Sequence, residues 1–369
     1  MLKPLLSFLS LLLTVNSYAQ IYLNPGVDTS FTKVKSALKF YNNYISEFKG
    51  RKLPDMSKYW SADELNQRKV PDQLIYALND SPLYSQGYQR TIIYVRPTDN
   101  YVQIKTQFSS VDSSKNIMTM AITNHYIKFN SNNEPQFINP ITTNTVRWQH
   151  TTIRNVTYFY PPYHKFNSID ANKLITSVVK LENEWDIKPI AIRYYFADDN
   201  DELYKLRGFD YALLMGNALK PSGISDDKDN QVFCGGLNEN YFHEVVHLYL
   251  NHLYPKSPIQ EGLAVLYAGS MGHAVKWHLK RVDQYLSQHP KSDLSKLDDF
   301  WYTDPYTNPG SAIQGMICSL VYKKDGVSGL KRIMKCTSYK DIFENEFQVS
   351  VAQMNTFLRK TIHNEAQDN

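Results

Sequence analysis

A run of apolar residues between positions 242 and 253 predicts a helix that packs along one side only. The apolar residues that recur there at helical spacing are Phe242, Val245, Val246, Tyr249, Leu250 and Leu253. At about 100° per residue, His243 and His247 fall at the edge of this stripe. We therefore expect a helix that holds two imidazoles beside a core, in a position that can face an enclosed cleft.

His243 and His247 also have the spacing of a metal site. Side chains four residues apart on a helix lie on one face, about 6 Å apart at Cβ, which suits two imidazoles on one tetrahedral zinc. Glu244 follows the first histidine directly, where a general base can act on a water at the metal. Because such a histidine pair also arises by chance, the metal prediction depends on a third ligand.

A second predicted helix supplies that third ligand. Ser257 is expected as its N-cap, Pro258 fits the first helical position, and Gln260 completes a capping box. Glu261 then lies in the first turn, and a turn between the two helices would bring it back to His247. Two histidines and one carboxylate leave a fourth position for water, which is the pattern of catalytic zinc sites.

The run His243-Glu-Val-Val-His247, followed by Glu261-Gly-Leu-Ala, resembles the gluzincin metallopeptidases, in particular the peptidase MA-like and aminopeptidase N-like groups. The resemblance covers about residues 150–345. It implies a thermolysin-like zincin domain with a mainly helical C-terminal part, one Zn2+ on these two histidines and Glu261, and Glu244 as the catalytic base. The implied activity is hydrolysis of peptide bonds in a peptide or protein substrate.

The same resemblance suggests a second catalytic residue. In the aminopeptidase-like group, a tyrosine shortly before a glycine-led helix stabilises the oxyanion. Tyr306, four residues before Gly310, is the candidate here, and Tyr302 is its rival. His273 and His278 have no supporting motif and are expected on a surface helix. No anchor for a free amino group is visible, which favours an endopeptidase or a very restricted action.

The remaining pattern predicts an α+β protein of two domains. Residues 31–48 predict a long helix, and residues 101–108, 117–129 and 145–154 predict antiparallel strands. This order of helix and then strands resembles the NTF2-like fold. We expect that α+β domain to span residues 20–148 and to influence substrate access.

The metallopeptidase-like domain is expected to span residues 149–369. Strands and helices alternate between residues 155 and 234, and helices follow to the end. The strand at 231–234 is expected at the edge of the cleft, where an extended peptide can add as a further strand.

Residues 1–19 read as a signal peptide. Lys3 gives a positive start, residues 5–15 are apolar, and Ala19 ends a small-residue cleavage site. This run of about 11 residues is too short to span a membrane, which takes about 20. We therefore expect a secreted or periplasmic protein, cleaved near Ala19, with no membrane span.

The net charge argues against one class of function, and the cysteines allow two states. A net charge of +4 over 369 residues is too small to indicate nucleic-acid binding. Of the three cysteines, Cys318 and Cys336 can either form a bridge or stay as buried free thiols.

Two alternatives to a peptidase stay open. One is an exported ligand-binding protein with a retired peptidase domain, that is, one that has lost its catalytic activity. The other is a zinc hydrolase of a non-peptide amide.

Overall fold

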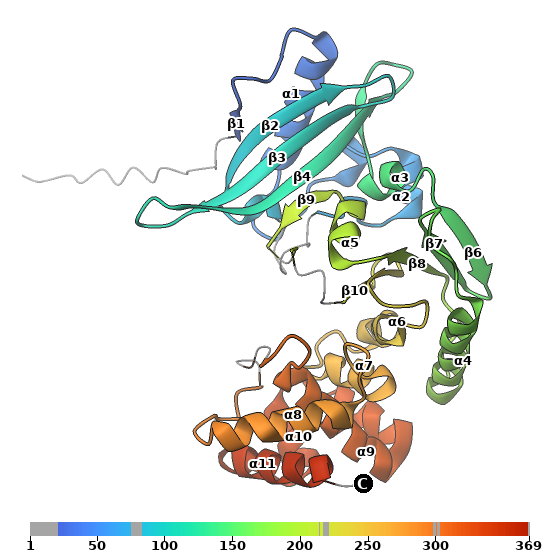
Figure 1. The fold of residues 1–369 in the computed structure, drawn as a ribbon, viewed down its shortest axis with the longest axis vertical. Helices are drawn as coiled ribbons and strands as arrows, with labels where there is room; N and C mark the ends of the chain where they lie inside the picture. Colours follow the sequence, from blue (N-terminus) through green and yellow to red (C-terminus); the bar gives the residue numbers. More distant parts are fainter. Residues whose placement is uncertain are drawn as a thin grey trace, which may run out of the picture. The chain divides into compact units, whose positions relative to one another are not determined.

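The structure, a computed structural model, describes residues 21–74, 83–213, 215–216, 221–297, 300 and 303–367. The predicted signal peptide and Tyr302 lie outside the described residues. The chain is a mixed α+β protein with two sheets, as predicted (Figure 1). Within the part of the chain that is described, no helix combines the length and the apolar character needed to cross a membrane.

The chain divides into two compact units that are interleaved in sequence. The first comprises residues 1–61, 72–138 and 209–213, and the second comprises residues 62–71, 139–208 and 214–369. Each unit has its own sheet.

In the first unit, one long helix packs against a mainly antiparallel sheet, in which β1 pairs with β2 in parallel. Helix α1 (Thr32–Ser46) contacts strands β2, β3 and β5 and buries its apolar face there. The sheet has the order β1-β2-β3-β4-β5, and β9 also pairs with β4. Its strands are β1 (Ile21–Leu23), β2 (Gln89–Pro97), β3 (Val102–Val111), β4 (Ile117–Phe129), β5 (Pro135–Ile138) and β9 (Phe209–Ala212). The predicted helix and the first two predicted strands are confirmed.

A buried polar network lies inside the first unit. Tyr44 and Tyr84 donate hydrogen bonds to Asp72 at 2.7 and 2.9 Å, and the hydroxyl of Tyr84 lies 2.7 Å from Nε2 of His125. Tyr41 packs edge-on against His125. Burial lowers the pKa of His125 to about 3, so this imidazole is neutral at physiological pH.

The sheet of the second unit has the order β10-β11-β8-β7-β6. Its strands are β6 (Gln149–Ile153), β7 (Val156–Tyr160), β8 (Ile192–Ala197), β10 (Ser222–Asp226) and β11 (Gln231–Gly235). β11 is hydrogen-bonded on both sides, so the prediction that residues 231–234 form an edge was wrong; β10 is the edge. The strand predicted at 145–154 is β6, and it pairs with β7 in this sheet.

Helices cover both faces of this second sheet. The alternation of adjacent residues separates the two faces: Tyr194 faces the core with α4 (Ser168–Trp185) and α6 (Phe242–Leu250), whereas Tyr195 packs with α3 (Pro140–Asn144) and α5 (Asn200–Leu206). Helix α2 (Ala62–Gln67) precedes these four in the chain and belongs to the same unit.

The C-terminal part of the second unit is helical, as predicted. Its helices are α6 (Phe242–Leu250), α7 (Gln260–Ala268), α8 (Val275–Gln288), α9 (Pro309–Met334), α10 (Tyr339–Glu346) and α11 (Val351–Gln367). All six contribute to one continuous core. Cys318 is a buried free thiol in this core and Cys336 is a partly exposed one, so the two do not form a bridge.

Candidate metal centre

Helix α6 carries the two predicted histidines at the boundary of the core. Val245 and Val246 pack in the core on the apolar side of the helix. His243 and His247 are also buried, with 4% and 8% of their surface exposed. Because these side chains are enclosed, their nitrogen atoms must find partners within the protein.

The end of α6 and the loop before it are fixed by hydrogen bonds. Tyr249 donates to Oε1 of Glu182 on α4 at 2.6 Å and accepts from Nδ2 of Asn155 at 3.0 Å. Before the helix, Tyr194 on β8 donates to the carbonyl of Asn238 at 2.7 Å. These bonds tie the helix to α4 and to the sheet, which gives its histidines a rigid support.

Helix α7 begins later than predicted. Its first residue is Gln260, so Ser257 and Pro258 precede the helix and the predicted capping box does not form. The side chain of Gln260 instead donates to the carbonyls of Tyr254 and Asn251, at 2.8 and 3.3 Å. Gln260 thus closes the turn between the helices, and this turn returns α7 to α6.

Glu261 lies in the first turn of α7, as predicted, and its helix is packed closely against α9. A Cβ atom added to the neighbouring Gly262 would lie 2.6 Å from the carbonyl oxygen of Gln314 and 2.8 Å from Sγ of Cys318. Glycine is therefore required at position 262 by the closeness of the two helices. This contact holds the turn that carries Glu261 close against α9.

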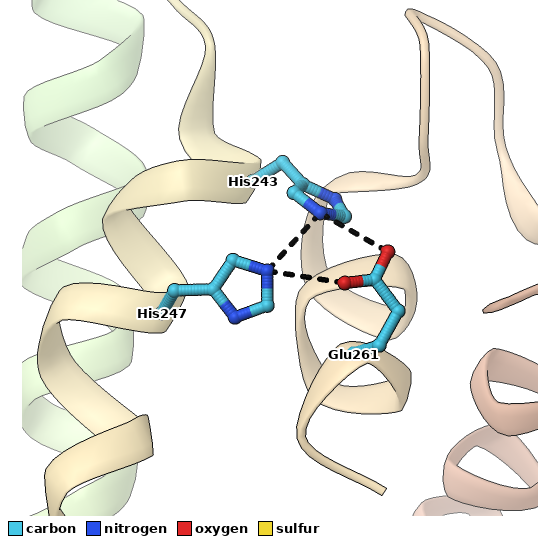
Figure 2. Close-up of side chains that lie close together, drawn as sticks. All are labelled: His243, His247 and Glu261. Carbon is cyan, nitrogen blue, oxygen red and sulfur yellow. Dashed lines mark hydrogen bonds and ion pairs between the residues drawn. The ribbon is translucent and has the colours of Figure 1, made fainter. Parts of the chain in front are cut away.

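The three predicted ligands meet at one point (Figure 2). Nε2 of His243 is 3.4 Å from Oε1 of Glu261, and Nε2 of His247 is 3.3 Å from Oε2 of the same carboxylate. The two Nε2 atoms are 3.2 Å apart. Two helices that are separated by a turn thus bring a carboxylate to both imidazoles.

The distances between these atoms are of the size that one metal ion requires. Ligand atoms bound to tetrahedral zinc at about 2.0–2.1 Å are separated from one another by about 3.3–3.4 Å. The two Nε2 atoms are 3.2 Å apart, and each lies 3.3 or 3.4 Å from a different oxygen of Glu261, so one carboxylate faces both imidazoles. Two imidazole nitrogens and one carboxylate oxygen are also a common donor set for catalytic zinc.

Each histidine has an acceptor for its other ring nitrogen. Nδ1 of His243 donates to the carbonyl oxygen of Gly269 at 2.7 Å, and Nδ1 of His247 lies 3.2 Å from Oδ1 of Asn251. Both bonds leave Nε2 turned toward the point where the ligands meet. Fixing the tautomer in this way is typical of metal-binding histidines. Sequence reasoning missed both acceptors, although Asn251 is four residues after His247, on the same face of the helix.

Charge complementarity holds the three groups together. Burial is the largest single effect on His243 and lowers its pKa, but the hydrogen bond and charge of Glu261, together with the charge of Glu244 and the carbonyl of Gly269, outweigh it and raise this pKa to about 9. The pKa of His247 is raised by the same carboxylate, also against burial. Burial raises the pKa of Glu261, but hydrogen bonds from both imidazoles hold it well below its usual range. A metal ion that binds here must therefore displace protons from the imidazoles.

Glu244 lies in the same cleft as the three ligands. The cleft has a volume of ≈ 440 Å³. Side chains and backbone from β10, from α6 and from the loop after α7 line it, including Ser225, Tyr241, Glu244, Asn251 and Met271. Glu244 is 7% exposed, so its carboxylate is largely enclosed. Tyr241 was not singled out from the sequence, and its ring is stacked on that of His243 with centroids 5.8 Å apart.

Tyr306 is placed in an aromatic cluster. Its ring packs edge-on against His273 and Trp277, with centroids 6.1 and 6.4 Å away. Among the described residues that line the cleft, Tyr306 is not included. The prediction that His278 lies at the surface was wrong. Its side chain is buried, with Nδ1 hydrogen-bonded to Thr307 and Nε2 to the carbonyl of Ser270.

Two helices and a single turn thus assemble two imidazoles, one carboxylate ligand and a second carboxylate in one cleft. This set can bind a divalent cation and move a proton beside it. Comparisons with protein-family models, with curated proteins and with solved structures found no match.

Proposed function

We propose that this protein hydrolyses peptide bonds with a zinc ion bound by His243, His247 and Glu261. The observation that carries the proposal is the meeting of two Nε2 atoms, 3.2 Å apart, with the two oxygens of one carboxylate at 3.3 and 3.4 Å, a spacing close to that of ligand atoms around one zinc ion. When bound, zinc supplies a Lewis acid that polarises the scissile carbonyl and activates water.

Glu244 is the general base of this proposal. It follows His243 on α6 and lines the same cleft as the three ligands. Its carboxylate accepts a proton from the attacking water and passes it to the leaving amine. The largely enclosed position of Glu244 excludes bulk water, which strengthens electrostatic interactions at the site.

The same proposal assigns each of the two parts of the chain to a known fold. We assign residues 149–369 to a gluzincin, thermolysin-like zincin domain, supported by the alternation of strands and helices before α6. We assign the first unit, which holds most of residues 20–148, to an NTF2-like domain, supported by α1 packed against a mainly antiparallel sheet. Export after cleavage near Ala19, supported by the apolar N-terminal run, would place the enzyme with secreted or periplasmic substrates.

Metal content and two glutamate variants test the proposal. Glu244→Gln keeps size but cannot accept the proton, so zinc stays bound while hydrolysis is lost. Glu261→Gln replaces an anionic ligand with a neutral one, so zinc affinity itself falls, and His243→Ala and His247→Ala behave likewise. Zinc per chain is measured by mass spectrometry after purification without added metal. Hydrolysis is measured with a library of internally quenched fluorescent peptides.

Four outcomes contradict the proposal, each at a different point. A zinc content near zero in the wild-type chain removes the metal site itself. Unchanged zinc affinity in Glu261→Gln removes the gluzincin ligand set but keeps a metal. Zinc binding with no cleavage of any peptide favours the retired peptidase, whereas cleavage of non-peptide amides alone favours the other hydrolase.

A further inference from the structure

The edge strand β10 runs beside the helix that carries the metal-binding motif. Ile224 on β10 packs toward the core with Tyr195 and Phe233, on the far face of the sheet. Since side chains alternate along a strand, the neighbouring Gly223 faces the opposite side, toward α6. β10 and α6 are in contact there, and both line the cleft that holds the three ligands.

Gly223 leaves a space that the residues of α6 occupy. A Cβ atom added at this position would overlap Cε1 of Tyr241. It would also lie 2.7 Å from Oε1 and 2.9 Å from Cγ of Glu244, closer than Cβ atoms approach other atoms in proteins. The three nearest atoms thus belong to Tyr241 and Glu244, and none belongs to a predicted zinc ligand.

The backbone of Gly223 does not itself require glycine. Among the described glycines, those with a positive φ angle do not include Gly223. Glycine inside a strand also destabilises it, by roughly 0.5–1 kcal/mol relative to alanine. The presence of glycine here is therefore explained by the room it gives to neighbouring side chains, and not by strand geometry.

We propose that Gly223 is a positioning residue for Glu244. Because no side chain intervenes, the carboxylate of Glu244 lies directly against the backbone of the edge strand, which fixes its direction in the cleft. Any side chain at position 223 would push this carboxylate away from its place beside His243. This inference rests on the proposed role of Glu244 as general base, and it adds a residue that acts through that base.

The substitution Gly223→Ala separates this role from metal binding. Zinc per chain should equal that of the wild type, because the three atoms nearest to the added methyl group belong to Tyr241 and Glu244 and not to a ligand. For a displacement of the base by about 1 Å, turnover of the quenched peptides should fall about 100-fold, with KM changed little. Gly26→Ala is the matched control, since its added Cβ would meet only Oδ1 of Asn24, at 3.5 Å.

A second variant covers the case in which Gly223→Ala does not fold. Tyr241→Ala removes the nearest overlap, so the double variant Gly223→Ala/Tyr241→Ala retains only the conflict with Glu244. It should turn over far more slowly than Tyr241→Ala alone. Equal rates in these two proteins would overturn the inference, as would wild-type kcat in Gly223→Ala or a loss of zinc that parallels its loss of rate. Failure of the proposed function is seen separately, as absence of zinc or activity in the wild type.

Discussion

Asn251 offers a direct test of how the metal centre is held together. Its Oδ1 lies 3.2 Å from Nδ1 of His247, at the long end of the range for such a bond. In Asn251→Ala, Nδ1 of an imidazole that is only 8% exposed loses its acceptor. We expect a cost of about 1–2 kcal/mol, the lower part of the range for an unpaired buried group, which corresponds to roughly 5–30-fold in zinc affinity.

The assay is competition for zinc against a chromophoric chelator at fixed pH, and the readout is the dissociation constant. Asn251→Asp restores an acceptor and adds a negative charge, so its affinity should equal or exceed that of the wild type. His252→Ala is the control, because His252 follows Asn251 but bonds only to the carbonyl of Leu248 among the contacts described. Equal zinc affinity in wild type and Asn251→Ala would refute the reasoning. An equal loss in His252→Ala would show that the effect is not specific to the acceptor.

Three further predictions concern other parts of the chain. His125 has a pKa of about 3 when folded and about 6.5 when unfolded, so stability falls as pH decreases through this window, by about 2 kcal/mol at pH 5. Denaturant unfolding at pH 7 and 5 should show a smaller pH dependence in His125→Gln. Gly262→Ala should lower the free energy of unfolding by about 1–3 kcal/mol through overpacking against α9, seen as a lower Tm without metal. Tyr306→Phe should keep a wild-type kcat and KM, because its ring packs with His273 and Trp277 and is not among the described residues that line the cleft; a lower kcat would support the catalytic role that the resemblance implies.

The grouping of the ligand atoms was predicted from the sequence because spacing alone determines much of it. A separation of four residues on a helix places His243 beside His247, and a turn between two helices can return Glu261 to them. The structure brings these three residues together. The start of α7 was predicted too early, because Gln260 closes the turn with its side chain and does not cap the helix. Local capping patterns do not reveal such tertiary use of a side chain.

The edge of the cleft was not predicted, because β10 has no strand-like pattern. Its five residues, Ser222–Asp226, include one apolar side chain, Ile224, so the alternation that indicates a half-buried strand is missing. Residues 222–226 form a strand through their pairing with β11, which the local sequence does not reveal. Sequence likewise gave no sign that residues 209–213 join the first sheet, since strands distant in the chain pair through tertiary contacts.

The close contact between Gly262 and α9 has a consequence for the order in which the protein matures. The position of Glu261 depends on backbone and side-chain atoms of Gln314 and Cys318, more than fifty residues later in the chain. A nascent chain that has exposed both histidines and Glu261 still lacks the surface against which α7 is pressed. Because chains emerge from the N-terminus first, we expect His243, His247 and Glu261 to reach their final spacing only after α9 has been made. Under the proposed zinc binding, the metal would then be taken up late, after synthesis of its three ligands.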